Sequence, residues 1–144
     1  MKLLIDTNVI IYYLLSDAVH FNECKALIDR VIATEDCEII SASAVTDIFY
    51  IVNKQKKDSF SVQDAIKDLM QLIHVASVTE SDIAYALDLH WEDFEDAVQY
   101  SVALSNGADV IISYNSKDFQ NSSIPVKSPS DFAAEMSVNT ANTD

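Results

Sequence analysis

Residues 2–15 read KLLIDTNVIIYYLL, and this stretch combines two hydrophobic patterns around one acidic residue. Residues 2–5 form a short apolar run of the kind that makes a buried strand, whereas the apolar residues at 9–15 follow helical spacing. Asp6 lies at the junction between the two patterns. The stretch therefore predicts a strand that leads directly into a helix, with a carboxylate where the strand ends.

The same alternation of strand and helix recurs along the chain. Further strands are predicted at residues 38–41, 75–78 and 110–113, with a short edge strand at 125–128. Helices are predicted to begin near His20, Ser43, Ser61, Thr79 and Asp93, and the last of these to end at Gly107. Strands separated by helices predict an α/β fold, a three-layer α/β/α sandwich around a central, mainly parallel sheet of four or five strands.

Composition indicates one domain. The chain has 144 residues, 49% of them hydrophobic, and this is enough for one core without disulfides. One Gly and two Pro argue against an all-β fold, which needs many turn residues. Cys24 and Cys37 are expected to be free, buried thiols. Because the chain is small and polar from Ser137 onward, we expect a single domain over residues 1–136 and a disordered tail over residues 137–144.

Charge and missing motifs limit the function. There are 23 Asp and Glu against nine Lys and Arg, and the formal net charge of −14 favours metal ions or a basic protein as partners. With a single glycine the chain has no Gly-rich phosphate loop, and its two Cys and three His lack zinc-ligand spacing. The apolar opening contains Asp6 and Asn8 and is too short to cross a membrane, so the expected location is the cytoplasm.

Several acidic residues lie where predicted strands end. Asp6 follows the first strand, Asp47 lies early in the helix after the second, and Asp118 follows the last long strand. Asp93 and Asp96 open the helix that leads to that strand. In a parallel sheet these positions meet at one edge, where a hard divalent ion such as Mg²⁺ would relieve the repulsion among the carboxylates. Taken singly, each has a structural alternative, because Asp6 and Asp93 can cap helices and Asp47 can be an ordinary first-turn acid.

Four segments together resemble the PIN-domain nucleases. They are residues 3–10 (LLIDTNVI), 93–97 (DFEDA), 107–119 (GADVIISYNSKDF) and 128–132 (SPSDF). The resemblance implies a PIN-like sandwich and Mg²⁺- or Mn²⁺-dependent endoribonuclease activity, in which a metal-activated water hydrolyses a phosphodiester bond of RNA. Many small bacterial members, the VapC-like proteins, are toxins of type II toxin–antitoxin pairs. The resemblance thus also implies a homodimer and an antitoxin partner, which the net charge predicts to be basic.

The resemblance assigns roles by position. Asp6 and Asp96 match the first and third metal-binding acids of the family, and Asp47 occupies the second, where the family usually has Glu. Asn115 stands where a fourth acid is common, and Asp118 is expected to replace it. The predicted catalytic residues are therefore Asp6, Asp47, Asp96 and Asp118, with Asp6, Asp96 and Asp118 as metal ligands and Thr7, Asn8, Asp93, Ser113 and Asn115 as supporting residues.

Two other functions remain open from the sequence. The Glu-to-Asp and Asp-to-Asn departures suit a PIN-like module that binds RNA or protein with weakened catalysis. A phosphoacceptor signalling domain would also carry an acidic Mg²⁺ pocket, but it would need a Lys near the end of a late strand, for which Lys117 is poorly placed. With so few basic residues, RNA recognition should depend on metal-bridged phosphate contacts and on stacking by exposed aromatic residues such as Tyr114.

Overall fold

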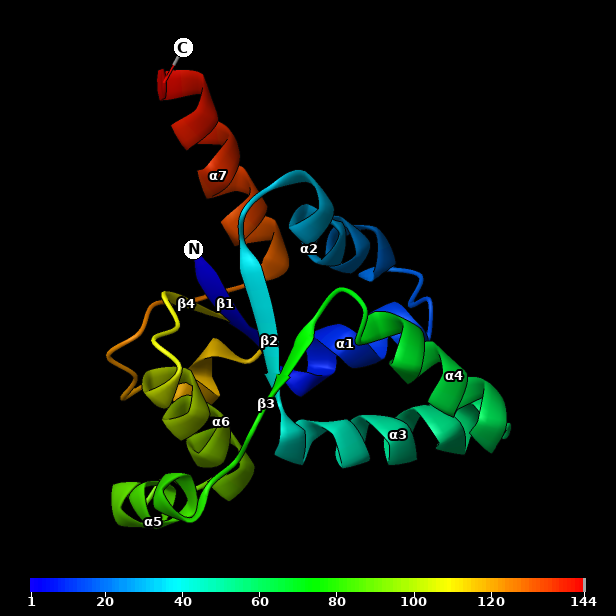
Figure 1. Cartoon of the computed structure of the whole chain (residues 1–144). Coiled ribbons are helices and arrows are strands. Elements are labelled where there is room, and N and C mark those ends of the chain that lie inside the picture. Colours follow the sequence, from blue (N-terminus) through cyan, green and yellow to red (C-terminus); the bar gives the residue numbers. More distant parts are fainter. Residues whose placement is uncertain (144) are drawn as a thin grey trace.

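Five parallel strands form the central layer of the computed structural model, which describes residues 1–143 (Figure 1). The strands are β1 (Lys2–Ile5), β2 (Cys37–Ser41), β3 (His74–Ala76), β4 (Val110–Ile112) and β5 (Val126–Lys127). The helices are α1 (Thr7–Leu14), α2 (Phe21–Ala33), α3 (Ala42–Lys56), α4 (Ser59–Leu69), α5 (Glu80–Leu89), α6 (Phe94–Ser105) and α7 (Pro129–Thr143), with a 3₁₀ turn η1 (Ser116–Phe119). The order across the sheet is β3-β2-β1-β4-β5, with every neighbouring pair parallel. The prediction of an α/β/α sandwich around four or five strands is confirmed.

Two hydrophobic cores lie on opposite faces of the sheet, because successive residues of a strand point to opposite sides. Leu3 and Ile5 of β1 belong to the core packed against α1, α2, α3, α4 and α7. Leu4 belongs to the core packed against α5 and α6, which lie together on the other side in Figure 1. All three side chains are fully buried. Burial on both faces explains why the strands read as continuous apolar runs.

The two central strands end at the same level. β1 and β4 pair in register with Ile5 opposite Ile112, and the backbone N–H of Asp6 donates to the carbonyl of Ile112 over 2.9 Å. Asp6 and Ser113 therefore leave the sheet side by side. Both strands run in the same direction, so this is the carboxyl edge of the sheet, where α/β proteins commonly bind ligands.

Some helix ends agree with the sequence prediction, whereas the start of α3 differs. Thr79 caps α5 in a capping box with Asp82, and Gly107 follows α6 with a φ of 67°, a left-handed conformation that glycine adopts readily. Ser43, predicted as a cap, instead lies inside α3, whose N-cap residue is Ser41. The two serine hydroxyls are hydrogen-bonded to each other over 2.8 Å. The last residue of β2 already has the extended backbone that an N-cap needs, so no loop separates strand from helix.

The C-terminal segment and one cysteine also differ from expectation. α7 continues through Thr143, beyond the boundary drawn at residue 136, because residues 137–143 contain no Pro or Gly that would stop a helix. Asp144 lies outside the described residues. Cys24 is a buried free thiol as predicted, but Cys37 at the start of β2 is exposed. Among residues 1–143 there is no helix long and apolar enough to cross a membrane.

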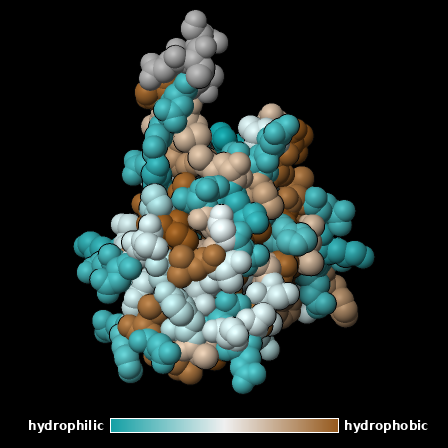
Figure 2. All heavy atoms as spheres, turned by 60° about the vertical axis from the view of Figure 1, so that its left-hand side comes forward, coloured by the Kyte–Doolittle hydropathy of each residue, from teal (hydrophilic) through white to brown (hydrophobic). Residues whose placement is uncertain are grey.

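The surface mixes polar and apolar residues. On the face shown in Figure 2, hydrophilic residues project around the outline and hydrophobic residues appear in several separate patches. Elsewhere, Phe49 and Tyr50 of α3, Ile66 of α4 and Met70, the C-cap residue of α4, line a groove of about 470 Å³ between these two helices. Tyr50 is 70% exposed, so α3 presents a large aromatic side chain to solvent.

One glutamate is buried within the sheet itself. Glu38 of β2 lies opposite Leu3 of β1 and is only 1% exposed. Neither of its carboxylate oxygens has a hydrogen-bond partner among the described residues. Burial raises the pKa of Glu38 to about 8, although the Arg30 guanidinium acts to lower it and the carboxylate of Asp36 acts to raise it. Glu38 is therefore mainly protonated at neutral pH.

Candidate active site

Asp6 lies at the centre of a hydrogen-bond network at the carboxyl edge of the sheet. Its Oδ1 accepts from the backbone N–H of Thr7 (2.7 Å) and from Nε2 of Gln99 (2.9 Å). Its Oδ2 accepts from the hydroxyl of Ser113 (2.6 Å). Asp6 is also the N-cap residue of α1, so the structural role considered from the sequence is real. Capping alone does not explain the bonds from Gln99 and Ser113, which come from two other elements.

The side chain of Gln99 links Asp6 and Asp96, which match the first and third metal-binding acids of the family. Its Nε2 donates to Oδ1 of Asp6 (2.9 Å) and, over a longer 3.4 Å, to Oδ1 of Asp96. The side chain is fully buried, and its Oε1 has no partner among the described residues. Sequence reasoning missed Gln99. Its signal was its position three residues after Asp96, which places the two side chains on one face of α6.

Glu95 is a second residue that sequence reasoning missed. The hydroxyl of Thr7 donates to its Oε1 over 3.2 Å, which ties α6 to α1. Burial raises the pKa of Glu95 to about 7, and the neighbouring carboxyl of Asp47 from α3 adds to the rise. Glu95 lies between Asp93 and Asp96 in the sequence, where it resembles an ordinary acid in the first turn of a helix.

The carboxylates of the site act on one another. Burial raises the pKa of Asp96 to about 8, and the charges of Asp6, Asp93 and Asp118 add to this effect. Burial also raises the pKa of Asp6, against the lowering effect of its three hydrogen bonds, and the charge of Asp118 contributes to the rise. Asp6 directly after β1, Asp96 of α6 and Asp118 of η1 thus influence one another electrostatically. Without a cation, such a cluster takes up protons.

The supporting residues differ in how closely they join this cluster. Asp93 is the N-cap of α6, where it accepts from the backbone N–H of Asp96 over 3.1 Å. The backbone N–H of Asn115 donates to the hydroxyl of Ser113 over 2.9 Å, which orients that hydroxyl toward Asp6. Asn8 makes no such link, since its buried Oδ1 has no partner among the described residues.

The donor atoms suit a hard divalent cation. They are the carboxylate oxygens of Asp6, Asp96 and Asp118, and Mg²⁺ and Mn²⁺ prefer such oxygen ligands. Within residues 1–143, however, no three Asp, Glu, His or Cys side chains already stand in an arrangement that could hold a metal ion. The residues therefore fit the cation chemically.

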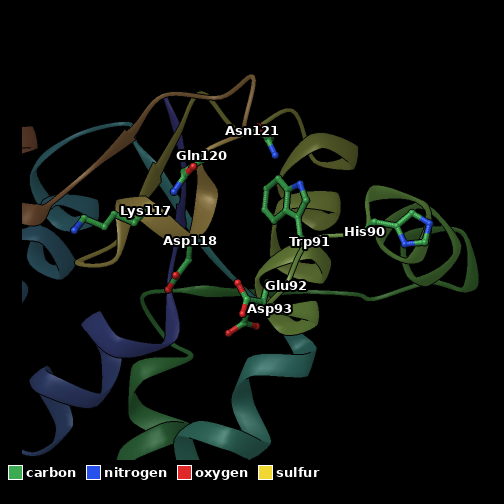
Figure 3. A pocket seen from close by; sticks show the side chains of 8 residues that line it. All are labelled: His90, Trp91, Glu92, Asp93, Lys117, Asp118, Gln120 and Asn121. Carbon is green, nitrogen blue, oxygen red and sulfur yellow. The ribbon is translucent and has the colours of Figure 1, made fainter.

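A cavity of about 630 Å³ adjoins the acidic cluster (Figure 3). It is lined by His90, Trp91, Glu92, Asp93, Lys117, Asp118, Gln120 and Asn121. Figure 3 shows the carboxylates of Asp93 and Asp118 toward one end and the side chains of Trp91 and Asn121 toward the other. Sequence reasoning did not identify the polar and aromatic end of this cavity.

Comparison with known proteins points to one family. The family model described as PIN domain matches residues 2–117. Ribonuclease VapC1 of Aquifex aeolicus (strain VF5) is 25% identical over 137 residues, which cover 91% of this chain and 92% of that protein.

Solved structures with a similar fold include two VapBC structures. VapBC-1 from nontypeable Haemophilus influenzae matches with a TM-score of 0.69 and 18% identity, over 90% of this chain and 99% of that one. VapBC2 from Rickettsia felis, bound to a DNA fragment from its promoter, matches with a TM-score of 0.67 and 17% identity, over 89% and 98%. VapC20 of Mycobacterium tuberculosis, described as a sarcin–ricin loop cleaving toxin, matches with a TM-score of 0.61 and 16% identity, over 76% and 86%.

Proposed function

Because this chain belongs to the PIN-domain family, we propose that it is a metal-dependent endoribonuclease and the toxin of a toxin–antitoxin pair. The observation that carries the proposal is the gathering of Asp6, Asp96 and Asp118 at the carboxyl edge of the two central strands. The relative from Aquifex aeolicus is named a ribonuclease, and the structural neighbour VapC20 is described as a sarcin–ricin loop cleaving toxin. Together these support hydrolysis of RNA by a single nuclease domain.

The buried acids are the proposed metal ligands. Asp6 and Asp96 are held in place by Gln99, and the exposed Asp118 of η1 can approach them from the solvent side. Mg²⁺ or Mn²⁺ bound there would lower the pKa of a coordinated water and balance the charge of the phosphate. The hydroxyl of Ser113 donates a hydrogen bond to Asp6, and the hydroxyl of Thr7 donates one to Glu95. Each hydrogen bond orients the carboxylate that accepts it.

Glu95 and Asp47 are the proposed proton-transfer pair. A carboxyl whose pKa is about 7 both takes up and releases a proton near neutral pH, as a general acid or base requires. The family resemblance led us to expect Glu at the position of Asp47. In this chain Glu95 of α6 lies beside Asp47. We propose that the longer side chain of Glu95 places a carboxyl group where the shorter side chain of Asp47 does not extend.

The charge of the chain supports a basic inhibitor. With a net charge of −14, the protein would attract a segment rich in Lys and Arg to the rim formed by Asp6, Asp47, Asp96 and Asp118. An Arg there would pair with the carboxylates and compete with the metal. We propose such an antitoxin as the partner, with a homodimer as the toxin's own assembly and the cytoplasm as its location.

Incubating the purified chain with single-stranded RNA in Mg²⁺, in Mn²⁺ and in EDTA tests the proposal. We expect cleavage in the first two and none in EDTA, and we expect Asp96→Asn to cleave in neither metal. RNA that is bound but never cut in metal-replete buffer would instead favour the alternative of a binding module. The exposed acid Glu35 provides a matched control, since Glu35→Gln should leave the cleavage rate unchanged.

A further inference from the structure

The cavity beside the acidic cluster has two chemically different ends. Asp93 and Asp118 connect it to the proposed metal site. Trp91, Gln120 and Asn121 line it farther away, from the segment before α6 and the segment after η1. Its volume of about 630 Å³ falls in the range of ~300–1,000 Å³ that is typical of sites for small ligands.

Trp91 offers a fixed aromatic surface. Its ring stacks on Tyr100, with centroids 4.9 Å apart and planes 20° apart, and it meets the ring of Phe119 edge-on at 6.0 Å. Tyr100 is itself held, because its hydroxyl lies 2.9 Å from the hydroxyl of Ser123. Trp91 remains partly exposed and lines the cavity. The indole is thus rigid on one side and accessible on another.

The polar groups around Trp91 have no partners of their own. Neither the indole N–H of Trp91 nor the side-chain amides of Gln120 and Asn121 make a hydrogen bond with any other residue of the described chain. Gln120 and Asn121 are exposed, and each amide offers two donors and one acceptor. This pattern complements the edge of a nucleobase, which also presents both donors and acceptors.

Tyr114, the aromatic residue that the sequence suggested for stacking on RNA, is already packed against other residues of the protein. Tyr114 meets the rings of Tyr12 and His20 edge-on at 5.3 Å and 4.6 Å. Its hydroxyl donates to Glu23 and lies 3.3 Å from the sulfur of Cys24. Tyr114 therefore serves the packing between α1, α2 and β4, and Trp91 is left as the aromatic side chain that opens into the cavity.

We infer that this cavity binds one unpaired nucleobase of the RNA strand next to the cleaved phosphate, stacked on Trp91 with its edge recognised by Gln120 and Asn121. The inference rests on the proposed function. The carboxylates exclude phosphate from their end of the cavity unless a cation is bound there, so the phosphate lies at the metal and the neutral base extends toward Trp91. Lys117 also lines the cavity and adds a positive charge there.

Binding can be measured without cleavage, because Trp91 is the only tryptophan in the chain. The four nucleoside 5′-monophosphates, which contain no internucleotide bond, are titrated in Mg²⁺ while tryptophan fluorescence is recorded. We expect saturable quenching that differs among the four bases and exceeds the quenching of free N-acetyltryptophanamide. Asn121→Ala should weaken binding about 2- to 10-fold, the loss of one net hydrogen bond, whereas Asn22→Ala on the exposed face of α2 should not.

A second experiment measures the binding of a labelled single-stranded RNA pentamer. Trp91→Ala should weaken its binding about 5- to 150-fold, as expected for the loss of base–aromatic stacking. Because Trp91 also packs on Tyr100, that variant is paired with Gln120→Ala, which removes an exposed side chain and should leave the melting temperature unchanged. Both Gln120→Ala and Asn121→Ala should change which base is preferred beside the cleaved bond.

The outcomes separate this inference from the proposed function. Cleavage of RNA without any quenching by the monophosphates would overturn the base-binding cavity and leave the nuclease standing. The pentamer could instead displace the monophosphates and reverse the quenching, while the protein never cleaves RNA. That result would support base binding in the cavity and refute the proposed nuclease activity. Quenching that an excess of pentamer fails to displace would mean a site for free nucleotides, and it would overturn the inference.

Discussion

The buried carboxyl of Glu38 should make the protein less stable as the pH rises. The folded state keeps a proton on Glu38 up to a pKa of about 8, whereas the unfolded chain releases it near 4.5. Between these two values the folded state binds more protons than the unfolded state. The contribution of Glu38 to stability is therefore greatest below pH 4.5 and falls as the pH rises toward 8.

The size of the effect follows from the two pKa values. At ~1.4 kcal/mol for each pKa unit, the difference between 4.5 and about 8 sets an upper limit of ~5 kcal/mol on the free energy lost by pH 8. Glu38→Gln removes the ionisable group and keeps the shape and the burial. At pH 4.5 both side chains are neutral, so the variant should match the wild type. At pH 8 it should be more stable by at least ~2 kcal/mol, allowing for local relaxation around the charge.

Urea unfolding in EDTA at pH 5 and pH 8 measures this difference. With an m-value of ~2 kcal/mol/M, typical of a small domain, the variant's midpoint should rise by ~1 M or more at pH 8 and by little at pH 5. Asp6, Asp96 and Glu95 also have raised pKa values, but both proteins share them, so they cancel from the comparison.

Glu35→Gln is the matched control, because Glu35 lies on the exposed loop before β2. It should shift neither midpoint. If Glu38→Gln changed the unfolding free energy equally at the two pH values, the carboxyl would have to be compensated in the folded state, for example by Arg30, and the reasoning would fail.

Three further predictions concern the proposed site. Asp6→Asn or Asp96→Asn should reduce RNA cleavage at least 100-fold while the metal-free melting temperature holds or rises, because one repelling carboxylate is gone; full activity of either purified variant would refute its assignment. Millimolar Mn²⁺ should raise the melting temperature of the wild type, because an ion that binds only the folded state stabilises it, and an equal rise in the Asp6→Asn, Asp96→Asn double variant would indicate screening of surface charge instead. An inhibitory partner should bind more weakly in Mn²⁺ and in high salt, measured by calorimetry, and an affinity indifferent to both would place its contacts away from the acidic rim.

Local patterns predicted the elements well but not the contacts between them. The strands at residues 2–5 and 110–113 were readable because burial on both faces leaves a continuous apolar run. The sequence predicted Ser43 as the cap of α3, whereas the structure has Ser41. Either serine suits a cap, and only the backbone conformation of Ser41 decides between them. Residues 137–143 were expected to be disordered but continue α7, because a polar composition without Pro or Gly does not itself stop a helix.

The sequence predicted the candidate site only in part, because local patterns do not give the contacts between elements. Asp6, Asp96 and Asp118 could be grouped because each lies near the end of an element and the parallel topology joins those ends. Glu95 was missed because its role depends on Thr7 from α1 and Asp47 from α3. Trp91 was not identified as a site residue from the sequence. Its exposure to the cavity depends on η1, which lies more than 20 residues later in the chain.

The double role of Asp6 has an evolutionary consequence. Asn at this position would still cap α1 through its amide oxygen, and its amide nitrogen could donate to the hydroxyl of Ser113, which accepts as readily as it donates. A lineage under selection to silence this protein would therefore have an easy path, since one substitution removes a proposed metal ligand and leaves a folded chain. Descendants inactivated in this way would persist as stable proteins able to bind the proposed antitoxin, rather than being cleared by proteolysis as unfolded chains are.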